Sequence, residues 1–213
     1  MNLLAEEMTG VKKIVDALRA STHEFKNKLH VILGLVEGGK LQEVKGYIGS
    51  VNDELQSTIS SILGCIHEPT VAALCIGKSQ RGHELKVALE LSEETEFTNA
   101  LRFDVNALVV ILGNLLDNAM EALDGFDRTD KRVELLLNDE GEGLRVTVRD
   151  NGPGLPDPLR VFEKGYTTKT GSRGYGLFLV REQVEKYGGT ITAHNLPQGG
   201  TEFVIAMERG ERK

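Results

Sequence analysis

The sequence is poor in cysteine, has no long apolar run and carries no excess of positive charge. Its two cysteines, Cys65 and Cys75, lie in an apolar helical pattern without CxxC spacing, which predicts reduced core thiols and argues against a disulfide or a cysteine metal site. No run of about 18 apolar residues occurs, and Glu6 and Glu7 stand where a signal peptide would be apolar, so we expect the chain as given to be soluble and cytoplasmic. The net charge of -7 argues against a nucleic-acid partner, because phosphate backbones select basic surfaces.

The chain is long enough for two modest domains, since its 213 residues are 40% hydrophobic and 27% charged, an ordinary globular composition. Apolar residues recur alternately three and four positions apart over residues 3–36, which predicts one long helix with a heptad seam, ending at Gly38 and Gly39. A second helix is predicted over 41–66, ending before a proline. A hairpin of two such helices buries only one stripe of each, so we expect two chains to pair through residues 1–68 into a four-helix bundle.

The first predicted helix carries a histidine that faces water. With the seam at the a and d positions of the heptad, His23 falls at b, just outside the seam. Glu24 beside it can hydrogen-bond one ring nitrogen and leave the other free to attack, and Asn27 lies one turn away on the same face. An exposed histidine beside a glutamate is most often plain surface, so its meaning depends on the rest of the chain.

Beyond residue 69 the pattern changes to short strands and helices. We expect a helix over 71–80, a strand over 84–91, a helix over 104–123 capped by Asp104, strands over 132–137 and 144–149, a helix over 175–187, and strands over 190–194 and 201–207. Helices on one face of a mainly antiparallel sheet make an α/β sandwich. We therefore divide the chain into a helical hairpin at 1–69, a sandwich domain at 70–208 and a frayed tail at 209–213.

Four features of the second half together suggest a nucleotide site. Asn114 and Asn118 lie one turn apart on a single helix face. Asp150 is followed by two glycines that let a flat ligand approach the backbone. Residues 161–169 form a loop rich in hydroxyls and lysines, and a glycine-rich loop at 171–177 runs into a helix N-terminus, whose unpaired amides suit phosphate oxygens. Each feature alone has a structural explanation, as a cap, a turn or a solvated loop, but the four in this order are hard to explain that way.

The four segments resemble the N, first glycine, F and second glycine boxes of sensor histidine kinases, within the wider ATPase fold shared with DNA gyrase, mismatch-repair ATPases and large heat-shock chaperones. The segment from Thr22 to His30 is similar to the phosphoacceptor helix of the citrate and C4-dicarboxylate sensing kinases. The resemblance covers nearly the whole chain. It implies an α+β fold in which an N-terminal antiparallel helical hairpin dimerises into a four-helix bundle and is followed by an α/β sandwich that binds ATP.

The resemblance also implies how each box binds ATP and Mg2+. Asn118 would coordinate Mg2+ with support from Asn114, and Asp150 would accept a hydrogen bond from the adenine amino group. The other residues implied to shape the pocket or contact the nucleotide are Gly152, Gly154, Thr167, Thr168, Gly174, Gly176, Leu177 and Thr201. The cation that meets the β- and γ-phosphates is left open among Lys164, Lys169 and Arg173.

The same resemblance implies a phosphoryl transfer. His23 would attack the γ-phosphorus of ATP while Glu24 orients the ring and takes its proton, and the phosphoryl group would then pass to an aspartate of a response regulator. Asn27 would orient water for dephosphorylating that regulator. The implied partners are a response regulator, a second copy of the chain and an upstream sensor domain, in a full-length parent anchored in the cell membrane.

Two other functions share part of this pattern. An ATP-driven conformational machine of the gyrase or chaperone class needs the nucleotide boxes but no acceptor histidine, and the pairing of His23 with Glu24 argues against it. A non-catalytic phosphotransfer or scaffold protein would keep the helical bundle with a decayed nucleotide site, and the intact Asn118, Asp150 and glycine loops argue against that. Whether phosphate passes within one subunit or between two depends on the handedness of the hairpin and stays open.

Overall fold

The structure is a computed structural model that describes residues 33–40, 43, 57–100, 102–139, 141, 143–167 and 174–208. Its contacts divide the chain into two compact units, residues 1–56 and 57–213. Most of the predicted first helix lies outside the described residues, and so do His23, Glu24 and Asn27.

The described part of the first unit is the end of a helix. Residues 33–37 are helical, and the helix closes with the Lys40 amide bonded to Leu35 O at 2.9 Å and the Gly39 amide bonded to Val36 O at 3.0 Å. Gly39 has a φ of 71°, the left-handed conformation that this pair of bonds requires. The predicted end of the first helix is confirmed.

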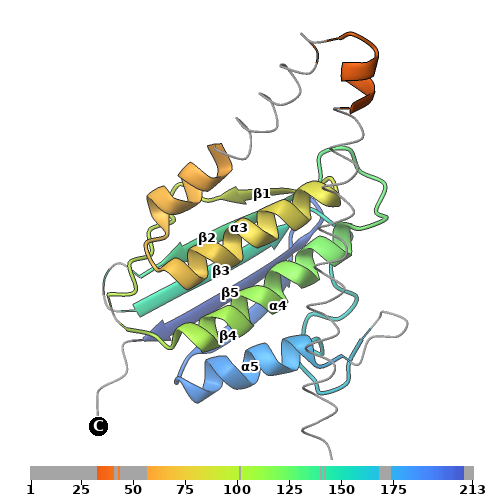
Figure 1. Cartoon of the computed structure of the whole chain (residues 1–213). Helices are drawn as coiled ribbons and strands as arrows, with labels where there is room; N and C mark the ends of the chain where they lie inside the picture. The colour runs from red at the N-terminus through yellow and green to blue at the C-terminus, as the bar shows by residue number, and fades with distance from the viewer. Residues whose placement is uncertain are drawn as a thin grey trace, which may run out of the picture. The chain divides into compact units, whose positions relative to one another are not determined.

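The second unit is a five-stranded sheet with the strand order β1-β2-β3-β5-β4 and three helices over one face (Figure 1). The strands are β1 (Ala88–Leu91), β2 (Arg132–Asn138), β3 (Gly143–Asp150), β4 (Thr190–Asn195) and β5 (Thr201–Glu208). β1 pairs with β2 in parallel, and the pairs β2–β3, β3–β5 and β5–β4 are antiparallel. The helices are α3 (Pro69–Glu84), α4 (Val105–Leu123) and α5 (Gly176–Lys186), with α4 between the other two. The predicted α/β sandwich is confirmed.

Helix α4 lies against the sheet at the centre of the core. Asp104 caps it as predicted, because its Oδ1 accepts the amides of Asn106 at 2.9 Å and Ala107 at 3.3 Å. Its buried side chains are Ala107, Leu108, Ile111, Leu112, Leu115, Leu116, Ala119, Met120 and Leu123. By length and composition α4 could cross a membrane, but this apolar face is also what a core helix needs to cover a sheet. Asn114 and Asn118 lie outside the apolar face and are only half-buried.

The segment between α3 and β1 differs from the prediction. Helix α3 extends beyond the predicted range 71–80 at both ends, and the following strand begins only at Ala88. Lys86 has a φ of 57°, and the Val87 amide bonds to Gly82 O at 2.8 Å. The chain therefore turns sharply at a point where the alternating apolar pattern indicated a strand.

The end of the predicted second helix packs into the second unit. Residues 57–65 are helical, and Ile62 and Ile66 are buried in the same core as the sheet. These two side chains contribute to the sandwich core and not to the bundle seam that their spacing predicted. The contacts divide the chain before residue 57, and the functional boundary at residue 69 stays a prediction.

Candidate functional site

Asp150 ends strand β3 as a buried carboxylate, with 4% of its surface exposed. Its Oδ1 accepts the Gly152 amide at 2.8 Å and the Thr201 amide at 3.3 Å, and the Thr201 side chain adds a further hydrogen bond. Burial raises the pKa of Asp150, and these hydrogen bonds partly oppose the rise. A carboxylate can accept about four hydrogen bonds, so this one has room for another donor. Two predicted adenine-site residues, Asp150 and Thr201, are thus joined directly.

Glycines let three backbone segments meet around this carboxylate. A Cβ on Gly152 would stand 2.9 Å from Asp150 Oδ1, and a Cβ on Gly154 would stand 3.1 Å from Asn195 Oδ1. Gly200, in the turn between β4 and β5, has a φ of 101°, and a Cβ there would overlap the Asp150 carbonyl oxygen. The two predicted glycines therefore lie at the site, and Gly200 is a third that the sequence presented only as a turn residue.

Two asparagines that the prediction missed hold the loop after β3. Asn151 accepts the Arg132 amide at 3.0 Å and donates to Asp130 O at 2.7 Å, which ties the start of the loop to β2. Asn195, the last residue of β4, bonds both backbone polar groups of Leu155. Asn151 stands inside the predicted first glycine box, whereas the signal that Asn195 gives in the sequence is a polar residue at the end of a strand.

The asparagine face of α4 meets the first residue of α5. Asn114 Nδ2 donates to Val110 O at 2.7 Å, and a Cβ on Gly176 would stand 2.9 Å from Asn114 Oδ1. Helix α5 begins at Gly176 without a side-chain cap, so its first amides can bind anionic oxygens. Asn118 is half-buried one turn further along α4. The structure thus places Asn114 at the start of the predicted phosphate-binding helix, with Asn118 one turn further along α4.

The described part of the loop at 161–169, which we call the lid, contacts the glycine loop that precedes α5. Gly174 passes so close to the lid that a Cβ on it would stand 2.5 Å from Tyr166 O. Lys164 Nζ lies 5.9 Å from the centre of the Tyr175 ring and 5.8 Å from that of Phe178. One of the three predicted phosphate cations therefore stands at the beginning of α5.

The remaining predicted residues are described only in part. Leu177 is partly buried against the core, and Thr167 is exposed at the end of the lid segment. Thr168, Lys169 and Arg173 lie outside the described residues. Of the nucleotide contacts predicted in the lid, the structure therefore describes Lys164 and Thr167.

Oxygen atoms on α4 provide the chemistry for a metal ion. Mg2+ prefers hard oxygen ligands, and the carboxamide oxygens of Asn114 and Asn118 are of that kind. Asp117, next to Asn118, would be a stronger ligand, but it forms an ion pair with Lys78 of α3. Among the residues that the structure describes, no three His, Cys, Asp or Glu side chains group into a metal cluster. The two asparagines therefore remain the candidates for Mg2+.

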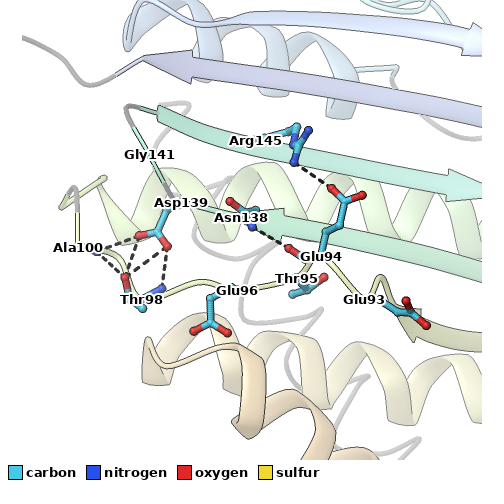
Figure 2. A pocket seen from close by; sticks show the side chains of 10 residues that line it. All are labelled: Glu93, Glu94, Thr95, Glu96, Thr98, Ala100, Asn138, Asp139, Gly141 and Arg145. Carbon is cyan, nitrogen blue, oxygen red and sulfur yellow. Dashed lines mark hydrogen bonds and ion pairs between the residues drawn. The ribbon is translucent and has the colours of Figure 1, made fainter.

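A hollow of about 940 Å³ lies at the end of β3 opposite to Asp150 (Figure 2). Its lining includes Asp139, which is 4% exposed and accepts the amides of Thr98 and Ala100, one on each carboxylate oxygen and both at 2.9 Å. These bonds fasten the loop at 93–100 to the turn between β2 and β3. We interpret the hollow as part of a structural junction.

Comparison with known proteins adds two matches to families and several to individual proteins. Residues 103–211 match the family of histidine kinase-, DNA gyrase B- and HSP90-like ATPases, and residues 4–65 match the α-helical domain of SpoOB-type sensor kinases. The chain is 36% identical to the sensor protein CitS of Halalkalibacterium halodurans over 214 residues, which is 99% of this chain and 40% of that protein. It is 37% identical to the sensor histidine kinase DcuS of Escherichia coli K12 over 213 residues, 98% of this chain and 39% of that protein. The chain thus spans about two fifths of the length of these curated relatives.

Solved structures share the fold. The catalytic domain of the histidine kinase ThkA superposes with a TM-score of 0.52 at 22% identity, over 66% of this chain and 90% of that one. Full-length ShkA in complex with AMPPNP superposes with a TM-score of 0.52 at 22% identity, over 82% of this chain and 40% of that one. At these identities the likeness concerns the fold alone, and it agrees with the predicted ATPase-type sandwich.

Proposed function

Because this chain belongs to the family of histidine kinase-, DNA gyrase B- and HSP90-like ATPases, we propose that it is the catalytic core of a two-component sensor histidine kinase. It would transfer the γ-phosphoryl group of ATP to His23 and then to an aspartate of a response regulator. The observation that carries the proposal is that one chain joins this ATPase fold, over 103–211, to a sensor-kinase helical domain, over 4–65, which contains His23.

The adenine side of the site would be formed by the end of β3 and the loop after it. Asp150 is a buried acceptor with room for one more donor, which suits the amino group of adenine. Thr201 is bonded to it, and Gly152 and Gly154 leave the backbone accessible to a flat base. This arrangement supports adenine recognition by Asp150 and Thr201.

The phosphate side would be formed by α4, α5 and the lid. The uncapped N-terminus of α5 can receive phosphate oxygens, and Asn114 and Asn118 can hold Mg2+ beside it. When bound, Mg2+ would offset the charge that develops on the phosphates during transfer. Lys164 stands near the start of α5, which supports it as one phosphate cation, and Lys169 and Arg173 remain candidates.

The transfer step would form a bond between a ring nitrogen of His23 and the γ-phosphorus while the bond from that phosphorus to the ADP oxygen breaks. A neutral imidazole with a pKa of about 6.5 is a competent nucleophile at pH 7. Glu24 would orient the ring and accept its proton. The product, a phosphoramidate, would pass its phosphoryl group to the aspartate of a response regulator, and Asn27 would orient water for removing it there.

Several partners belong to the same proposal. The helical hairpin would pair with that of a second chain through residues 1–68, with the exception of side chains such as Ile62 that pack into the sandwich. A relative in Halalkalibacterium halodurans that is 37% identical over 97% of this chain is named a probable C4-dicarboxylate sensor kinase, which supports a small organic acid as the signal, read by a sensor domain in a membrane-anchored parent.

Incubation with γ-labelled ATP and Mg2+ tests the proposal. We expect a protein-bound label that is labile in acid and stable in alkali, absent in His23→Gln and in Asn118→Ala, and retained in the matched control His30→Gln. ATP hydrolysis without label would support the conformational ATPase instead, and absence of ATP binding would support the scaffold. Mixed dimers of His23→Gln and Asn118→Ala chains then distinguish the two directions of transfer, because only transfer between subunits would restore the label.

A further inference from the structure

We propose that Asn195 is a positioning residue for the adenine side of the nucleotide site. Its carboxamide would hold the loop that follows Asp150 in the conformation that admits the base. This inference rests on the proposed function, because it assigns a role within the same site.

The Asn195 side chain bonds the loop at two points of one residue. Its Oδ1 accepts the Leu155 amide at 2.7 Å, and its Nδ2 donates to Leu155 O at 2.8 Å. The same Oδ1 would stand 3.1 Å from a Cβ on Gly154, so the carboxamide lies directly against the second glycine of the loop. One side chain therefore fixes both the direction of the backbone at Leu155 and the position of Gly154.

The sheet register joins this clamp to the carboxylate. Asn195 pairs with Thr201 across β4 and β5, and the Thr201 amide bonds Asp150. The loop is held at its start by the bond from the Gly152 amide to Asp150 and at its end by Asn195. Both anchors thus belong to the same end of the sheet, and the residues between them are those that the base would approach.

Only a carboxamide of this length matches the two backbone groups. Leu155 presents a donor and an acceptor, and asparagine offers an acceptor and a donor in one rigid plane. Aspartate at position 195 would face the Leu155 carbonyl with a second acceptor, and alanine would bond neither group. A loop released in this way must be ordered again when the base binds, which weakens affinity without changing the reacting groups.

The full chain is compared in wild-type form and as Asn195→Ala, Asn195→Asp and the control His194→Ala, which changes the exposed neighbouring residue of β4. The readouts are the Kd for ADP, the KM and kcat of autophosphorylation with ATP, and the hydrogen-exchange rate of the Leu155 amide without nucleotide. We expect Asn195→Ala to raise the Kd and the KM about 5- to 30-fold, which corresponds to about 0.5–1 kcal/mol for each of two solvent-exposed hydrogen bonds, with kcat at saturating ATP within about twofold. Asn195→Asp should be no better than Asn195→Ala, and His194→Ala should match wild type.

Each outcome decides one point. A wild-type chain that binds no adenine nucleotide overturns the proposed function itself. Wild-type affinity in Asn195→Ala, or a fall in kcat with unchanged KM, overturns the positioning role alone. If Asn195→Ala does not fold, Asn195→Ser takes its place, and the Leu155 amide must then exchange faster than in wild type for the inference to stand.

Discussion

Replacing Asp150 by asparagine separates the binding role of this side chain from its effect on stability. The change keeps the shape of the side chain and one oxygen. In the wild-type protein Oδ1 accepts the amides of Gly152 at 2.8 Å and Thr201 at 3.3 Å, and the asparagine oxygen can still accept both. The other oxygen becomes an NH2 group, which faces the adenine amino group with a donor in place of an acceptor. A hydrogen bond to a charged group contributes about 1.5–3 kcal/mol, so the Kd for ADP should rise roughly 10- to 150-fold.

The same substitution should not destabilise the folded protein at pH 7, although it weakens nucleotide binding. Burial raises the pKa of Asp150 above its ordinary value, so the folded protein holds the proton more tightly than the unfolded chain does. The contribution of this group to stability is then fully present below the unfolded pKa and is lost as the pH rises through the folded pKa. At pH 7 the ionised carboxylate is a cost that a neutral amide avoids, and we expect Asp150→Asn to unfold at or above the wild-type temperature at pH 7. The difference should shrink as the pH falls, because the raised pKa lets the buried carboxylate take up a proton more readily than an ordinary aspartate does.

Calorimetric titration with ADP and GDP, together with thermal unfolding at two pH values, measures both effects. Guanine carries an acceptor where adenine carries its amino donor, so the preference for ADP over GDP should fall as well. Glu202→Gln is a matched control, since this carboxylate at the same end of the sheet is paired with Arg149 outside the site, at 2.6 Å. Unchanged ADP affinity in Asp150→Asn would refute adenine recognition by Asp150, and a lower unfolding temperature at pH 7 would refute the argument from burial.

Three further predictions concern the helices. Gly176→Ala should displace the Asn114 carboxamide, whose Oδ1 would lie 2.9 Å from the new Cβ, and weaken ATP binding in the presence of Mg2+ by about 1 kcal/mol while thermal unfolding stays near wild type. A double-mutant cycle of Lys78→Met and Asp117→Asn should give a coupling of about 0.2–1 kcal/mol that falls with added salt, because Asp117 is half exposed; urea unfolding measures it, and a coupling unaffected by salt would contradict the assignment. Burial raises the pKa of Cys75 to about 12, so this thiol should not react with thiol reagents at pH 8 until the protein unfolds, as labelling during a urea titration would show.

Local signals were sufficient for most of the fold. The cap at Asp104, the glycine pair that ends the first helix and the alternating apolar residues of β5 each act within a few positions, so the sequence alone reveals them. The predicted start of the first strand at residue 84 was wrong, because Lys86 takes a left-handed conformation. Lysine rarely adopts this conformation, and no local signal in the sequence indicates it. Ile62 and Ile66 have the spacing of a bundle seam, and tertiary packing placed them in another core.

The site was predictable as a set of motifs but not as an arrangement. Asp150 and Thr201 are 51 residues apart, and their contact follows from the antiparallel register of β3 with β5. That register cannot be deduced from either motif, and only the family resemblance connected them. Asn195 escaped prediction for the same reason, since its role depends on its pairing with Thr201 and on its hydrogen bonds to Leu155, 40 positions earlier in the sequence.

Two buried aspartates at opposite ends of the β2–β3 pair show how a structural carboxylate differs from one that can bind a ligand. Asp139 and Asp150 are each 4% exposed. Asp139 receives a backbone amide on each oxygen, so the protein itself satisfies both ends of the carboxylate. Both backbone amides that reach Asp150 share Oδ1, and burial raises its pKa even though the Thr201 side chain adds a further hydrogen bond, so one more donor would stabilise the charged form. A donor from outside the chain can supply the missing compensation, and the adenine amino group is a donor of the required kind.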